Sequence, residues 1–110
     1  MKQFEAADLK RQQAVGSNRY LEFLREESLS MGLYVLPVGG VDTQQPHTED
    51  EVYYVVSGRG RFTSGGEDHA VQAGSIIYVA AHAEHHFHSI EEELQILVFF
   101  APAEYSQQGQ

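Results

Sequence analysis

The chain has 110 residues, of which 42% are hydrophobic, and its 7 basic and 16 acidic side chains give a formal net charge of -9. A chain of this length is expected to form one domain with its own apolar core. The absence of cysteine excludes thiolate zinc sites, iron–sulfur clusters and cysteine nucleophiles. The negative charge disfavours nucleic acid and anionic membrane surfaces as partners.

Targeting and membrane segments are not apparent in the sequence. The N-terminal residues lack the apolar centre of a signal peptide, and no later run approaches the roughly 20 apolar residues that a membrane helix needs. We therefore predict a cytoplasmic protein whose partner is a small molecule.

The first 17 residues are polar, with Phe4 and Leu9 as their main apolar side chains. They sustain neither a helical nor a strand period, so a short helix and an extended arm or edge strand both remain open. Residues 103–110 are also polar, and we predict that they form a flexible tail. A single barrel domain is expected between these ends, over residues 18–102.

Short apolar runs alternate with glycine-containing breaks through this central part. Turns are predicted at residues 57–60 and 65–66, because glycine supplies the positive φ that sharp reversals need. Residues 80–93 could form a helix on propensity alone. Regularly spaced short strands are typical of an all-β sandwich or barrel. The expected strands cover residues 20–25, 33–38, 51–56, 61–63, 68–71, 75–80 and 94–100.

An amide, a histidine and a carboxylate lie close together from Gln45 to Glu51. In an extended chain, Gln45 and His47 face the same side about 6.6 Å apart, which is close enough to reach one ion. A straight strand would place Glu51 about 13 Å from His47, too far for a shared ion. The chain must therefore bend at residues 48–50, whose two acids we expect to be solvated.

Four of the six histidines lie within seven residues of one another, and strand geometry sorts them. In a strand, His85 and Phe87 share one face, while His86 and His88 share the other. Phe87 marks the inner face, which favours His85 as a ligand and leaves His86 and His88 outward. His82 is expected in a turn, since histidine tolerates positive φ better than most residues.

Glycines and candidate ligands recur at spacings that resemble two motifs of the cupin family. The first comprises Gly39, Gln45, His47, Glu51 and Gly58, and the second comprises Gly74 and His85. The resemblance extends from about residue 19 to residue 102. It implies a small all-β fold, the double-stranded β-helix or jelly-roll barrel, with metal ligands converging inside it. Gln45 stands where the first motif usually has a histidine, and it is a weaker, neutral donor.

The ligand set implied by this resemblance is Gln45, His47, Glu51 and His85, with Gln45 optional. Two histidines and one carboxylate leave coordination positions open, an arrangement suited to Fe(II) and also available to Mn, Ni, Co or Zn. Glu51 is in addition the candidate catalytic residue.

Tyr53, Phe87 and Phe23 either belong to the core or line a substrate pocket. The leading functional hypothesis is a metal-dependent, dioxygenase-type enzyme acting on a small organic molecule. A non-catalytic ligand-binding or regulatory module, an isomerase and a lyase are the alternatives. We also expect a homodimer built from the N-terminal segment, because residues 4–15 have no obvious place in the barrel core.

Overall fold

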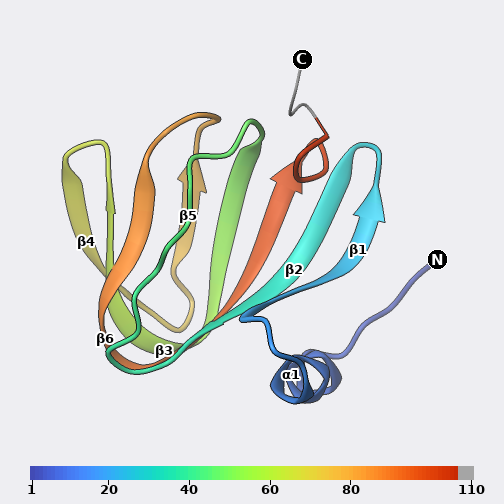
Figure 1. Cartoon of the computed structure of the whole chain (residues 1–110), viewed down its shortest axis with the longest axis horizontal. Coiled ribbons are helices and arrows are strands. Elements are labelled where there is room, and N and C mark those ends of the chain that lie inside the picture. The colour runs from blue at the N-terminus through green and yellow to red at the C-terminus, as the bar shows by residue number, and fades with distance from the viewer. Residues whose placement is uncertain (107–110) are drawn as a thin grey trace.

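The computed structural model describes residues 1–106, which form a curved antiparallel sheet and one helix (Figure 1). The strand order is β1-β2-β6-β3-β4, and β5 pairs with β3. The all-β class predicted from the sequence is therefore confirmed. The elements are α1 (Ala6–Val15), β1 (Tyr20–Glu26), β2 (Leu29–Leu36), β3 (Asp50–Ser64), β4 (Glu67–Gln72), β5 (Ile76–Val79) and β6 (His85–Ala101).

Strands β3 and β6 are the longest elements, and their pairing runs from Glu51 opposite Phe100 to Ser64 opposite His85. A straight ladder would place Glu51 and His85 about 40 Å apart. Their side chains instead approach to 3.0 Å, between Glu51 Oε1 and His85 Nε2. The two strands must therefore curve round a common interior, and this curvature assembles the candidate site.

The turn predicted at residues 57–60 is wrong, because β3 continues through this segment with irregular pairing to β6 between Val55 and Arg61. Gly58 has φ 98°, and a Cβ atom there would lie 2.1 Å from the Glu93 carbonyl oxygen. Glycine is needed here for a bulge and a close backbone approach, which bend a strand without ending it. The helix alternative for residues 80–93 is also excluded, since β6 begins at His85.

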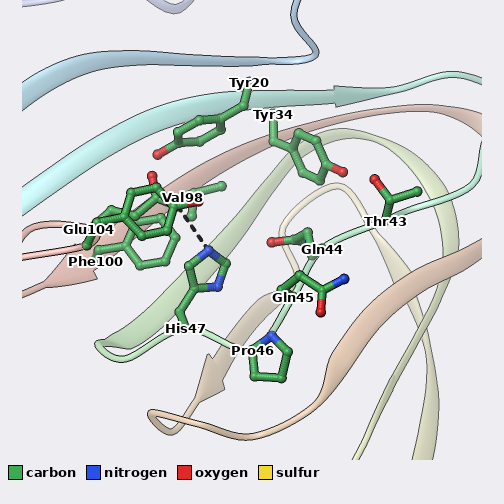
Figure 2. A pocket seen from close by; sticks show the side chains of 11 residues that line it. Tyr20, Tyr34, Thr43, Gln44, Gln45, Pro46, His47, Val98, Phe100 and Glu104 are labelled. Carbon is green, nitrogen blue, oxygen red and sulfur yellow. Dashed lines mark hydrogen bonds and ion pairs between the residues drawn. The ribbon is translucent and has the colours of Figure 1, made fainter. Parts of the chain in front are cut away.

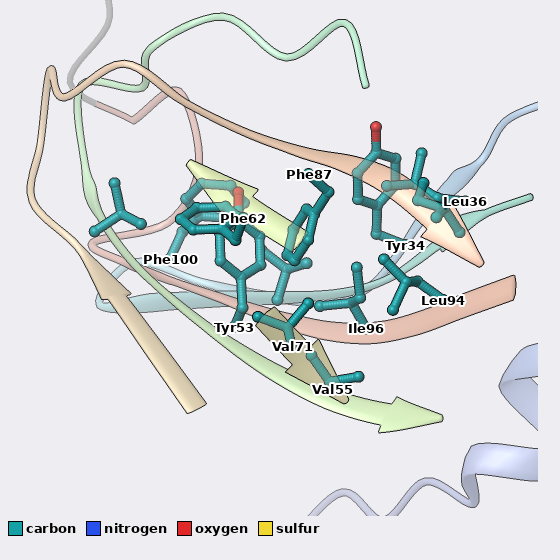
Figure 3. Packing of buried hydrophobic residues seen from close by; sticks show 13 residues of the cluster. Tyr34, Leu36, Tyr53, Val55, Phe62, Val71, Phe87, Leu94, Ile96 and Phe100 are labelled. Atoms are coloured by element: carbon teal, nitrogen blue, oxygen red, sulfur yellow. The ribbon is translucent and has the colours of Figure 1, made fainter. Parts of the chain in front are cut away.

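The main core lies inside the curved sheet, where aromatic rings from β3 and β6 pack together (Figure 3). The Phe87 ring centroid lies 5.0 Å from that of Tyr53 and 4.6 Å from that of Phe62. Tyr53 is 0% exposed and Phe87 is 1% exposed. Of the two readings of these residues, the structure supports core packing.

Helix α1 covers the other face of the sheet, where Leu9 packs with Leu33 and Val35. Phe23 joins this second cluster, and its ring lies 4.9 Å from that of Phe4. The N-terminal segment is therefore a helix with a place on its own sheet and not an edge strand. Phe23 packs beneath this helix, outside the barrel interior. None of the helices in residues 1–106 is long and apolar enough to cross a membrane.

The C-terminal segment departs from the predicted flexible tail. Ala103 and Glu104 are only 2% and 6% exposed. The Glu104 backbone N–H donates to Ser30 Oγ at 2.8 Å, and Arg25 Nη2 donates to the Glu104 carbonyl oxygen at 2.6 Å. The hairpin of β1 and β2 thus fixes the chain as it leaves β6. Residues 107–110, the rest of that expected tail, lie outside the described part.

Candidate metal centre

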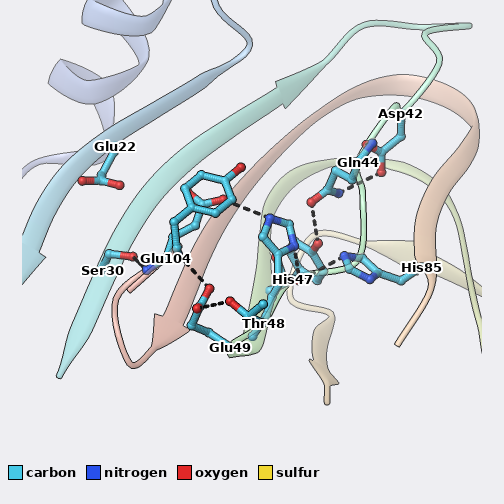
Figure 4. Close-up of polar contacts among 12 residues, drawn as sticks. Glu22, Ser30, Asp42, Gln44, His47, Thr48, Glu49, His85 and Glu104 are labelled. Atoms are coloured by element: carbon cyan, nitrogen blue, oxygen red, sulfur yellow. Dashed lines mark hydrogen bonds and ion pairs between the residues drawn. The ribbon is translucent and has the colours of Figure 1, made fainter. Parts of the chain in front are cut away.

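Three of the four predicted ligands meet in the interior of the barrel (Figure 4). His47 precedes β3, Glu51 lies at its start, and His85 is the first residue of β6. One ligand atom from each lies within 4.8 Å of the others, and all three residues are buried. Glu51 Oε1 is 3.0 Å from His85 Nε2 and 3.7 Å from His47 Nδ1. The pairing of His85 with Phe87 on the inner face is confirmed by their burial.

Two hydrogen bonds hold the loop that carries His47 and the start of β3 against the turn before β6. The His82 N–H donates to the His47 carbonyl oxygen at 2.6 Å, and the Ala81 N–H donates to Asp50 Oδ1 at 2.9 Å. His82 has φ 68°, which confirms its predicted turn conformation. These contacts bring His47 and His85 together from distant parts of the sequence.

Four buried polar atoms in this cluster make no hydrogen bond of acceptable geometry among the described residues, although two of them, Glu51 Oε1 and His85 Nε2, lie 3.0 Å apart: His47 Nδ1, both carboxylate oxygens of Glu51, and His85 Nε2. Buried polar groups are normally paired, because leaving them unsatisfied costs free energy. His85 Nδ1 lies 2.8 Å from the Ala83 carbonyl oxygen, to which it can donate, so the lone pair of a neutral ring is on Nε2. The donor set therefore fits a divalent cation.

The charge of Glu51 affects its neighbours. Burial lowers the pKa of His85, but the Glu51 carboxylate and the Ala83 carbonyl outweigh it and raise the pKa above its usual value. Burial, followed by the charge of Glu51, raises the pKa of Tyr53 well above its usual value. The Tyr53 hydroxyl donates to Gln44 Oε1 at 3.0 Å. The negative charge of Glu51 thus helps to keep the Tyr53 hydroxyl protonated and makes the His85 ring easier to protonate.

Gln45, the fourth predicted ligand, is exposed, whereas His47 is buried. The adjacent Gln44 points inward, where it accepts the Tyr53 hydroxyl and donates through Nε2 to Asp42 Oδ2 at 2.9 Å. In an extended strand, Gln45 and His47 would face the same side. Because the backbone bends here, one side chain is exposed and the other is buried. Ligation by Gln45 stays a prediction.

Two acidic residues of the site were not identified from the sequence. Glu49, expected to be solvated, is 1% exposed; its Oε1 accepts the Tyr105 N–H at 2.8 Å, and its other oxygen accepts from Thr48 Oγ1. Glu104 Oε2 lies 2.9 Å from His47 Nε2. Glu104 follows Pro102 in a polar segment with no periodicity, so the sequence offers no local signal for this contact.

A cavity of about 520 Å³ opens beside the cluster, with His47 in its wall (Figure 2). This volume is suited to a small organic molecule. The Tyr20 hydroxyl is buried without a partner among the described residues, and burial, followed by the charge of Glu104, raises its pKa far above the usual value. The lining residues are Tyr20, Tyr34, Thr43, Gln44, Gln45, Pro46, His47, Val98, Phe100, Glu104 and Tyr105.

The predicted pocket residues Tyr53, Phe87 and Phe23 are absent from this lining. The first two are too deeply buried in the core, and Phe23 faces the helix. Parity along a strand identifies a buried face, but it does not distinguish a filled interior from a cavity.

One family profile and one relative match most of the chain. The profile described as "Cupin domain" matches residues 32–100. An uncharacterized protein of Streptomyces coelicolor is 48% identical over 104 residues, which cover 94% of this chain and 99% of that protein.

Solved structures resemble the fold at lower identity. The TT1209 protein of Thermus thermophilus has a TM-score of 0.72 at 24% identity, covering 94% of this chain and 99% of that chain. The DMSP lyase DddQ of Ruegeria pomeroyi has a TM-score of 0.69 at 15% identity, covering 84% of this chain and 49% of that chain. These likenesses confirm the jelly-roll type of β-fold.

Proposed function

The chain belongs to the cupin domain family, and we propose that it binds a divalent cation through His47, Glu51 and His85 for chemistry on a small organic molecule. The observation that carries this proposal is the convergence, beside a cavity, of buried ligand atoms that make no hydrogen bond among the described residues. Structural metal sites are usually closed by four protein ligands, whereas three leave coordination positions open. The side-chain set therefore supports exchangeable ligands.

Two imidazoles and one carboxylate favour Fe(II) and also suit Mn, Ni, Co or Zn. When bound, such a cation would polarise a ligand oxygen and, as Fe(II), give access to oxygen chemistry. We therefore propose dioxygenase-type oxidation as the first reaction class to test. Glu51 would hold the negative charge of the site, which makes it the candidate on which activity depends most.

The cavity wall suggests how a substrate would be held. Val98 and Phe100 supply an apolar surface that excludes water, while Tyr20 presents a hydroxyl that remains protonated. Glu104 and Tyr105 add polar groups to the same wall. A small molecule with an apolar body and a hydrogen-bond acceptor fits this combination. Hydroxyls that donate hydrogen bonds would also serve a lyase or isomerase, by stabilising negative charge that develops on a substrate oxygen, and this is the second candidate.

The test is to load the protein separately with Fe(II), Mn, Ni, Co and Zn under anaerobic conditions. Small phenols, diketones and keto acids are then screened for oxygen uptake and for product by mass spectrometry. Glu51→Gln should abolish turnover, because a neutral amide replaces the only carboxylate of the three ligands. Glu67→Gln, an exposed change on β4, is the control that should retain it.

The outcomes separate the candidate functions. Product formation without oxygen uptake would favour the lyase or isomerase. If no metal form turns over any compound, yet one compound binds in the cavity, the non-catalytic binding module replaces the enzyme.

A further inference from the structure

His47 directs its two ring nitrogens toward different acids. Its Nε2 lies 2.9 Å from Glu104 Oε2, and its Nδ1 lies 3.7 Å from Glu51 Oε1 without a hydrogen-bond partner among the described residues (Figure 4). A carboxylate accepts hydrogen bonds, so the Nε2–H donates to Glu104. In a neutral imidazole the remaining lone pair is then on Nδ1, which faces Glu51 and His85.

Glu104 is held in place by its surroundings and not by the histidine alone. Its backbone N–H donates to Oγ of Ser30, which is fully buried, and its carbonyl oxygen accepts from Arg25. The next N–H, of Tyr105, donates to buried Glu49. Anchors from β1, from β2 and from the loop before β3 thus fix the turn that carries Glu104.

We propose that Glu104 is a positioning residue of the metal centre, which orients His47 so that Nδ1 and not Nε2 is the ligand atom. The inference rests on the metal site of the proposed function. A carboxylate that accepts the second ring N–H of a ligating histidine fixes the ring and increases its basicity. Glu104 would thereby strengthen a three-ligand set whose fourth predicted donor, Gln45, is exposed.

The geometry favours this role over direct ligation by Glu104. Glu104 is not in the group of His, Asp and Glu side chains whose ligand atoms converge within 4.8 Å. Its Oε2 is instead engaged by His47 Nε2. The C-terminal turn is accordingly part of the site as a support for His47.

The experiment uses the full chain with Zn(II), which is diamagnetic, and ¹⁵N-labelled histidine. Long-range ¹H–¹⁵N spectra identify the zinc-bound nitrogen of His47, whose signals are assigned by their loss in His47→Gln. We expect Nδ1 to bind zinc and Nε2 to carry the proton. Chelator competition should show zinc binding about 10–100-fold weaker in Glu104→Ala. Glu104→Gln should be intermediate, because its amide oxygen still accepts the bond but carries no charge.

Glu67→Gln removes one acidic charge away from the site and should leave zinc affinity unchanged. The proposal is overturned if the original protein binds zinc through His47 Nε2, or if Glu104→Ala retains full affinity with Nδ1 bound. Should Glu104→Ala fail to fold, unchanged affinity in Glu104→Gln overturns it as well. Binding through Nδ1 without turnover of any substrate would contradict the proposed enzyme and leave this inference intact. Absence of binding by zinc and by each of the other four metals would reject both.

Discussion

Replacing Gly58 by alanine should destabilise the protein strongly. A Cβ atom at this position would lie 2.1 Å from the carbonyl oxygen of Glu93 and 2.8 Å from Cα of Leu94. Both are backbone atoms of β6, so rotation of a side chain cannot relieve the overlap. The positive φ costs about 1–3 kcal/mol, and moving β6 away costs about 1–3 kcal/mol more. The expected loss of about 2–6 kcal/mol is a large share of the roughly 5–15 kcal/mol typical of a domain.

Gly65→Ala is the matched control, because Gly65 has φ 59° and nothing lies within 4 Å of its added Cβ. It should cost about 1–2 kcal/mol, from backbone conformation alone. Urea denaturation measures both variants, as a shift in midpoint at unchanged slope. Zinc affinity should also fall in Gly58→Ala, since curvature of β3 and β6 brings Glu51 to His85. If Gly58→Ala and Gly65→Ala lose stability to within about 0.5 kcal/mol of each other, the close approach of β6 is not the reason that position 58 needs glycine.

The ligand cluster was predictable because the resemblance to the cupin motifs implied its members and two local rules agreed with them. The spacing of His47 and Glu51 required a bend, and the alternation of His85, His86 and Phe87 along a strand selected one histidine. His86 is exposed, as that alternation requires. Both rules depend only on backbone geometry over a few residues, so they hold before the tertiary structure is known.

The incorrect predictions concern contacts between distant segments. Gly58 has the positive φ expected of a turn, but whether the chain reverses or bulges depends on β6, more than 30 residues later. Glu104 meets His47 across 57 residues, and no periodicity in a short polar segment reports such a contact. Phe23 alternates like a core residue, yet the face it occupies is covered by α1. Tertiary packing decided each of these outcomes.

Three further predictions concern the N-terminal segment and His85. Leu9→Ala should lower the free energy of unfolding by about 2–4 kcal/mol, because Leu9 is only 4% exposed and packs beside Leu33. Urea denaturation measures this loss, and an unchanged midpoint would contradict the packing of α1 on the sheet. Although α1 packs on its own sheet, sedimentation should detect a homodimer at micromolar concentration, and deletion of residues 1–17 should dissociate it. A full-length chain that sediments as a monomer would reject the homodimer. The last prediction follows from the pKa of His85, which the Glu51 carboxylate and the Ala83 carbonyl raise above 6.5 against the effect of burial. Stability from this group is complete below the unfolded value of about 6.5 and is lost as pH rises through the higher folded value. Metal-free protein should therefore lose more stability as pH rises above about 6.5 than metal-free His85→Gln does. Over the same range zinc affinity should rise, because the proton must leave Nε2 before zinc binds. Equal pH dependence in the two metal-free proteins would show that His85 is not the group responsible.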